Sequence, residues 1–250
     1  MASFLSAIRQ RFSRRSKSRR AQSYVELALI LPVLLIMLLG MVEIAFLISR
    51  YLDVLDLTRE AARFASVRDP FAVVLTDKDC STENLFDFYY DASCILSPPA
   101  DHATLCNDPK YCNGLNANVY LDPNYDDVVI SVFTVSGNIV TNTWPRPNGY
   151  WAYSENDNNT TNDGNWKKDC EGNVDASAQP YFTQSRINTM LQAGSPPNKG
   201  FVAVEFFYCY HQLLRIPVFT AFVPDPMRIH AYTIMPLPAA QPTATTTVNP

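Results

Sequence analysis

The chain has 250 residues, and its hydrophobic fraction of 47% is enough for the core of one or two domains. Its charge is uneven, because seven Lys and Arg and no acid lie within the first twenty residues, while the remaining 13 of the 20 Lys and Arg stand against all 24 Asp and Glu. This acidic excess argues against a nucleic-acid partner for the folded part, because phosphate binding needs a basic surface.

An apolar segment follows the basic arm directly. Residues 24–49 are apolar apart from Glu26 and Glu43, and residues 27–42 carry no charge. As a helix the 26 residues of this segment span about 39 Å, against about 30 Å for the hydrocarbon core of a bilayer. The segment therefore predicts one transmembrane helix. A removable secretory signal competes with this interpretation, but such a signal usually has an apolar stretch of only about 7 to 15 residues.

Orientation follows from the basic arm. Lys and Arg accumulate on the cytoplasmic side of membrane helices, so we expect the N-terminus inside the cytoplasmic membrane and the C-terminal part outside it. The expected organisation is a basic leader, a membrane and stem helix, an extracytoplasmic domain and a disordered Pro/Thr/Ala tail, at residues 1–21, 22–66, 67–235 and 236–250 respectively.

The stem is expected to continue the membrane helix, because residues 50–66 contain no Gly or Pro and separate into two faces. We expect the apolar face to pack on the chain's own domain; the alternative is a surface for neighbouring helices in an assembly. The apolar face contains Val54, Leu57, Ala61 and Phe64, and the polar face contains Asp53, Asp56, Glu60 and Arg63.

Ionisable residues in a membrane segment are functional candidates, because their burial in lipid is costly. Glu26 and Glu43 lie seventeen residues apart, about 26 Å along a helix, so both can reach water at opposite interfaces. For Glu43 we expect mainly this role of bounding the span. Pro32 removes one backbone donor inside the helix, so we also expect a kink there.

Glu26 lies in a pattern that resembles the N-terminus of a type IV pilin: residues 19–26 read RRAQSYVE, a basic pair, a small residue, four residues and a glutamate before a long apolar helix. In that class a prepilin peptidase cuts after the small residue, which here implies cleavage between Ala21 and Gln22. Pilins favour Gly before the cleaved bond, and this chain has Ala. The resemblance also implies that Glu26 pairs with the N-terminal amine of a neighbouring subunit during assembly.

The resemblance narrows to the TadE-like family, minor-pilin or pseudopilin components of tight-adherence (Flp-type) pilus systems. Residues 25–32 (VELALILP), a Leu-rich run with Gly40 and Glu43, and residues 59–65 (REAARFA) are similar to that family. The similarity covers about residues 19–66, and residues 200–238 are also similar to larger members. It implies a non-catalytic pilus-biogenesis component whose partners are membrane lipid, other pilin-like subunits and the inner-membrane assembly platform, and in which Glu26, Pro32 and Glu43 serve assembly.

Beyond the stem we expect an α+β fold, in which strands at residues 127–135, 201–210 and 228–235 form an antiparallel sheet on the stem helix. A polar insertion at about 141–180 holds all three tryptophans. We expect them to pin this long segment to the domain; the alternative is an aromatic platform for a glycan or a surface. The tryptophans are Trp144, Trp151 and Trp166.

Six cysteines lie on the outer side, where an oxidising compartment permits disulfides. Up to three bridges are expected, among fifteen pairings that the sequence leaves open. A metal site with Cys106, Cys112 and His102 is an alternative, but the chain has no short Cys-x-x-Cys pair, so disulfides are preferred. The candidates are Cys80, Cys94, Cys106, Cys112, Cys170 and Cys209.

No catalytic signature is found in the sequence, and we predict no enzymatic activity, cofactor, metal or small-molecule substrate. His211 and His230 lie in or beside expected strands, where a structural role is usual. Asp126 and Asp127 are adjacent on a strand and should point to opposite faces, unlike glycosidase carboxylates. Two rival functions remain: a membrane-tethered protein that recognises a surface polymer, and a secreted enzyme with an atypical site.

Overall fold

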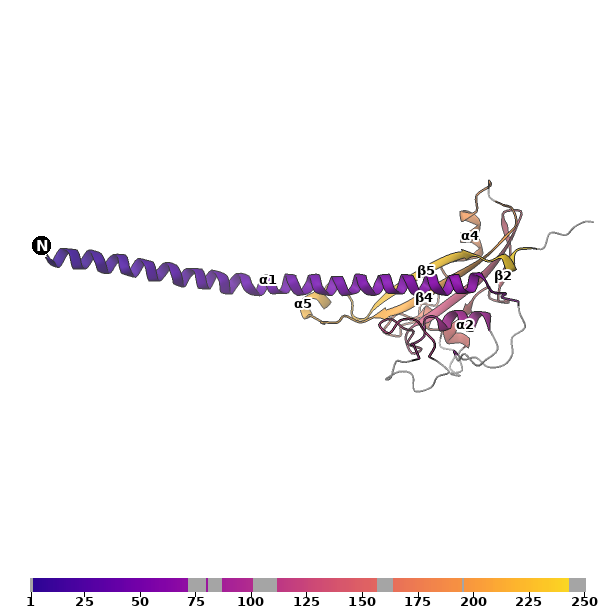
Figure 1. The fold of residues 1–250 in the computed structure, drawn as a ribbon, viewed down its shortest axis with the longest axis horizontal. Helices are drawn as coiled ribbons and strands as arrows, with labels where there is room; N and C mark the ends of the chain where they lie inside the picture. The colour runs from indigo at the N-terminus through magenta and orange to yellow at the C-terminus, as the bar shows by residue number, and fades with distance from the viewer. Residues whose placement is uncertain are drawn as a thin grey trace, which may run out of the picture.

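One long helix dominates the structure. The computed structural model describes residues 2–71, 80, 87–100, 112–156, 164–194 and 196–242. The expected membrane and stem helices form a single helix, α1 (Ala2–Ser66), which runs on through Pro32. Its N-terminal half projects away from the rest of the chain, and its C-terminal half lies along a sheet domain (Figure 1). The predicted fold class, a long N-terminal helix followed by an α+β domain with an antiparallel sheet and long loops, is confirmed.

The sheet is antiparallel throughout, with strand order β2-β1-β4-β5, and a short further strand, β3, also pairs with β1. All three predicted strands are present, as β1, β4 and β5. Two further strands were not predicted: β2 runs into the start of the polar insertion and β3 lies inside it, and neither has a clear apolar alternation. Gly137 and Asn138 turn the chain from β1 into β2, both at φ 61°, as a tight hairpin requires. The bounds are β1 Asp127–Ser136, β2 Ile139–Trp144, β3 Trp151–Ala152, β4 Lys199–Tyr210 and β5 Met227–Pro236.

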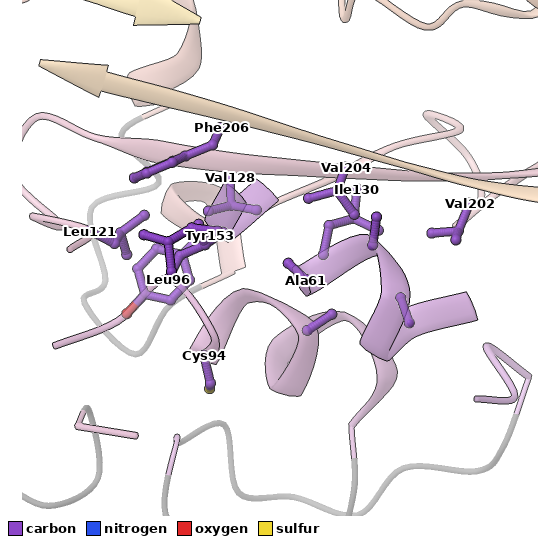
Figure 2. Close-up of a cluster of buried hydrophobic side chains, with 14 of the residues drawn as sticks. Ala61, Cys94, Leu96, Leu121, Val128, Ile130, Tyr153, Val202, Val204 and Phe206 are labelled. Carbon is purple, nitrogen blue, oxygen red and sulfur yellow. The ribbon is translucent and has the colours of Figure 1, made fainter. Parts of the chain in front are cut away.

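The stem half of α1 covers one face of this sheet. Ala61 of α1 is fully buried against the alternate side chains of the two central strands, and Leu96 joins them from the segment after α2 (Phe88–Cys94) (Figure 2). The expected packing of the apolar stem face on the chain's own domain is confirmed, while the polar face remains at the surface with an exposed ion pair between Arg63 and Glu60. The strand side chains are Val128, Ile130, Val132, Val202, Val204 and Phe206.

The opposite face of the sheet is covered as well. Phe133 and Ala203 pack there against Phe182 and against Ile187 of α4 (Gln184–Met190). Because both faces are buried, the central strands have almost continuous apolar sequences instead of a strict alternation. The remaining short elements are α3 Tyr153–Asn156, η2 Asn165–Lys167, α5 Pro217–Thr220 and η3 Pro238–Ala240.

The first residues of the predicted disordered tail are folded. Leu237 and Ala240 of the predicted disordered segment are buried, and the Leu237 amide donates to the carbonyl oxygen of Gly200 at 2.8 Å. Gly200 allows this approach, because a Cβ there would lie 2.2 Å from the Leu237 carbonyl oxygen. The expectation of disorder is therefore wrong for residues 236–242, and residues 243–250 lie outside the described part.

Candidate functional site

The projecting half of α1 presents an apolar surface to its surroundings. Ser23–Ser66 is long and apolar enough to cross a membrane, and only 6% of its most apolar 18-residue stretch is buried. A core helix of a soluble protein would be mostly buried, whereas side chains such as Leu29, Met37 and Met41 are exposed here. The chain thus has the make-up of a single-pass membrane protein, because apolar side chains without protein neighbours are stable in lipid.

The residues expected to take part in processing and assembly lie along this projecting half. Ala21 and Gln22 are consecutive residues of α1, one turn before Glu26. Both Glu26 and Pro32 are exposed, so each can be reached from outside the chain. The backbone continues as a helix past Pro32.

Glu43 is placed differently. Its side chain is 1% exposed, and its carboxylate oxygens accept hydrogen bonds from the last residue of β4 and from the segment after it. Oε1 accepts from the Tyr210 hydroxyl at 3.0 Å and from the Leu213 amide at 2.8 Å, and Oε2 accepts from the Leu214 amide at 2.9 Å. The expectation that Glu43 reaches water at an interface is wrong, because the chain's own domain surrounds the carboxylate.

Glu43 and Tyr210 form a buried polar contact that fixes the sheet domain to the helix. A buried carboxylate must be hydrogen-bonded, because its transfer out of water is otherwise very costly. Burial and the hydrogen bond to Glu43 raise the pKa of Tyr210 to about 12, so its hydroxyl stays protonated and acts as the donor. The three donors lie more than 165 positions from Glu43 in sequence, so no local pattern could reveal the contact.

Asp126 and Asp127, which are adjacent in sequence, connect segments of the domain. Asp126 accepts from the Cys209 amide at 2.7 Å, and Asp127 accepts from the amides of Ser154 and Trp166 at 3.0 Å and 2.9 Å. Burial raises the pKa of Asp126 to about 7 and that of Asp127 to about 6, in opposition to these hydrogen bonds. Both carboxylates point at backbone donors inside the domain, which is a structural arrangement and not that of an acid–base pair facing a substrate.

The two strand-associated histidines have structural surroundings. His230 Nε2 lies 2.9 Å from Oε2 of the buried Glu205, which also accepts from the amides of Tyr181 and Phe182. His230 therefore helps to hold the segment before α4 on the sheet, as expected of a structural histidine. His211 lies at the surface, 3.8 Å from Asp225.

The tryptophans do not form an exposed platform. Trp151 and Trp166 are 9% and 5% exposed, and Trp144 is half-buried. The Lys167 ammonium lies 4.7 Å from the Trp166 ring centre, and Tyr150 packs edge-on at 5.1 Å between ring centres. Tyr89 stacks on Trp151 at 6.0 Å between ring centres, and the Arg146 guanidinium lies 4.8 Å from the Trp144 ring centre. Each ring is thus in contact with the chain's own side chains, and the rings pin the insertion to the domain as expected.

The cysteines support the disulfide interpretation. Cys80 pairs with Cys94 and Cys170 pairs with Cys209, and the second bridge ties the insertion to the end of β4. Cys112 is also disulfide-bonded, so it cannot serve as a thiolate ligand. Cys106 and His102, the other members of the alternative metal site, lie outside the described residues. Within the described ranges no group of three potential metal ligands is found.

The comparison with protein families matches one part of the chain. A family model described as TadE-like protein matches residues 21–63, so the chain carries a TadE-like segment and the resemblance expected from the sequence is confirmed there. The match covers the apolar stretch of α1 and most of the stem, and it does not extend to residues 200–238. No curated protein and no solved structure matches the chain.

Proposed function

We propose that this protein is a non-catalytic, pilin-like component of a tight-adherence pilus system that acts through helix–helix assembly in the membrane. The basic arm faces the cytoplasm, α1 crosses the cytoplasmic membrane, and the sheet domain lies outside. Its partners are other pilin-like subunits and the inner-membrane assembly platform.

One observation carries this proposal: the TadE-like segment, residues 21–63, includes the apolar stretch of α1 that projects from the domain and exposes its surface. Such a surface can pack against a neighbouring helix as readily as against lipid, and in lipid van der Waals packing and polar contacts drive helix association. The stem half of the same helix is fixed in the core, so a contact made by the projecting half positions the whole sheet domain.

Glu26 is the residue that we assign to subunit contact. It is exposed near the start of the apolar segment, where a carboxylate beside a neighbour's amine gains from the low dielectric. Glu43 is buried by the chain's own domain, so it is available for assembly only if that contact opens. We therefore separate the two glutamates, with Glu26 acting between subunits and Glu43 within one.

Replacement of Glu26 tests this role. Glu26→Ala should abolish or strongly reduce pilus production, while carbonate extraction should still find the protein in the membrane, because the apolar span is unchanged. Asp56→Ala is the matched control, since it removes an exposed carboxylate of the same helix that pairs with the exposed Arg59. Normal pilus numbers in the Glu26→Ala strain would sink the assembly role.

The tethered polymer-binding protein remains the alternative of a different class. It would rest on the three tryptophans, but Trp151 and Trp166 are buried, and the half-buried Trp144 is in contact with Arg146, so no specific observation favours it. A purified sheet domain that bound a surface polysaccharide while the Glu26→Ala strain made normal pili would favour this alternative.

A further inference from the structure

The segment between β4 and β5 forms a loop that reaches along α1 toward its projecting half. The loop contains α5, which lies beside α1 at the end of the sheet domain that faces the projecting helix (Figure 1). A methyl group added to Gly40 would lie 3.9 Å from Cδ2 of Phe219. The loop therefore contacts the helix inside the uncharged stretch of residues 27–42.

The depth of this contact can be placed along the helix axis. A hydrocarbon core of about 30 Å corresponds to about 20 helical residues, and centred on the uncharged stretch it ends near residues 25 and 44. Gly40 lies four residues inside the second boundary, about 6 Å below the surface of the hydrocarbon. Segments that lie in the membrane interface bury their apolar face by about 5–10 Å, so the loop is at the depth of an interfacial anchor.

The side chains of residues 213–223 suit that depth. Leu213 and Phe222 are 61% and 85% exposed, and Leu214 is exposed as well. Large apolar side chains gathered at one exposed place mark a surface for apolar contact. The one charged residue of the segment is Arg215, whose Nε lies 3.3 Å from the Asp225 carboxylate at the base of the loop, so its charge points back toward water.

The backbone of the loop is also prepared for an apolar environment, in which an unsatisfied amide costs several kcal/mol. The amides of Phe219 and Thr220 donate to the Ile216 carbonyl oxygen, and those of Phe222 and Val223 donate to the Phe219 carbonyl oxygen. Glu43 accepts from the two amides at the start of the segment, Leu213 and Leu214. In a loop that stayed in solution, water would accept hydrogen bonds from these two amides. In lipid no water is present, so the buried Glu43 carboxylate takes its place as the acceptor.

A hollow of about 150 Å³ beside the loop shows where the polarity changes. Phe46 and Leu213 line it with apolar atoms, and Arg50, Asn118 and His211 line it with polar and charged groups. Arg50 also donates to the Asn118 carbonyl oxygen at 2.9 Å. The change falls between Phe46 and Arg50, which agrees with a hydrocarbon boundary near residue 44.

We propose that residues 213–223 insert beside α1 into the membrane leaflet on the side of the sheet domain and contact lipid acyl chains there. The domain then meets the bilayer at two places, which fixes its depth and its tilt relative to the membrane surface. The occupant is lipid because the loop is continuous with the lipid-facing surface of α1 and lies at the same level. This membrane insertion of the loop depends on α1 crossing a membrane and does not depend on the pilus role.

Site-specific fluorescence quenching in nanodiscs tests whether the loop inserts into the membrane. The full-length chain carries one added cysteine, as Phe222→Cys, labelled under non-reducing conditions with a polarity-sensitive fluorophore; the unsubstituted chain gives the background. Ile139→Cys is the control, because Ile139 is also exposed and apolar but lies at the far end of the sheet, paired with Ser136. That end is eleven residues of β4, about 36 Å, from Tyr210. Met37→Cys reports on α1 itself.

We expect phospholipids with a nitroxide near the headgroup end of the acyl chain to quench the label at position 222 by about half or more, as for an interfacial segment. The label at position 139 should be quenched by aqueous iodide and hardly by the lipid nitroxide. Iodide quenching at position 222 equal to that at position 139 would overturn the insertion, and so would shielding from both quenchers, which would mean that protein covers the loop. A label at position 37 that lipid nitroxides do not quench would overturn the membrane position of α1 and of the loop together.

Discussion

Replacement of Glu43 by Ala should release the 213–223 loop from the helix without unfolding the sheet domain. The substitution removes both acceptor oxygens and leaves the Tyr210 hydroxyl and the amides of Leu213 and Leu214 facing an apolar gap. The stem packs on the sheet through residues from Val54 onward, so the hydrophobic core that holds the fold together remains intact.

The size of the effect follows from the three lost bonds. Hydrogen bonds to a charged group contribute about 1.5–3 kcal/mol each, and such contributions are not additive, so we take the lower end and expect about 4 kcal/mol for the contact. Each 1.4 kcal/mol is a factor of about ten in an equilibrium constant, so the open form of the loop should become about a thousandfold more populated.

Hydrogen exchange followed by mass spectrometry on the full-length chain in nanodiscs measures this opening. Peptides covering residues 211–216 should exchange faster by about this factor, while peptides from β1 and β4 keep their protection. Glu43→Gln should fall between, because its amide oxygen still accepts but its NH₂ group cannot accept from a backbone amide. Glu60→Ala is the control, since it breaks an exposed pair with Arg63. Exchange in Glu43→Ala no faster than in this control would refute the reasoning.

The two remaining predictions concern acidity and processing. Burial raises the folded-state pKa of Asp126 to about 7 and of Asp127 to about 6, so the folded chain keeps protons that the unfolded chain has already lost. The thermal unfolding midpoint should therefore fall as the pH rises from about 4 to about 7 and then level off, with a weaker fall in Asp127→Asn; a midpoint that rises over this interval would contradict it. For processing, intact mass of the membrane-extracted protein from a pilus-producing host should show the loss of residues 1–21, with Gln22 as the new N-terminus, and an intact basic arm would exclude cleavage after Ala21.

Features that depend on residues close together in sequence were predictable. The membrane helix follows from a charge-free stretch, and the three main strands follow from clustered β-branched and aromatic residues. The apolar stem face was correctly expected to pack on the domain, because helical periodicity alone identifies that face. The family resemblance likewise rests on contiguous residues and is confirmed for residues 21–63.

Features that depend on distant pairing were not predictable. β2 and β3 are strands because they pair with β1, and their own sequences have little apolar alternation. Leu237 lies in a stretch of Pro, Ala and Thr that looks disordered, yet a glycine of another strand, Gly200, makes room for its backbone. The partners of Asp127 and Glu205 likewise come from segments that only the folded sheet brings together.

Glu26 and Glu43 show why the distinction between local and distant partners matters for function. Both are single carboxylates in one apolar helix, and position alone explains each as a charge that bounds the span, while the pilin resemblance singles out Glu26. The fold separates them, because β4 delivers Tyr210 and the following amides to Glu43, while the exposed Glu26 lies on the part of α1 that projects beyond the domain. A carboxylate that is hydrogen-bonded by its own domain stabilises a single subunit. A carboxylate on the projecting surface can instead be contacted by a neighbouring subunit. Replacement of Glu43 should therefore change how the domain sits on the membrane, and replacement of Glu26 should change whether subunits associate.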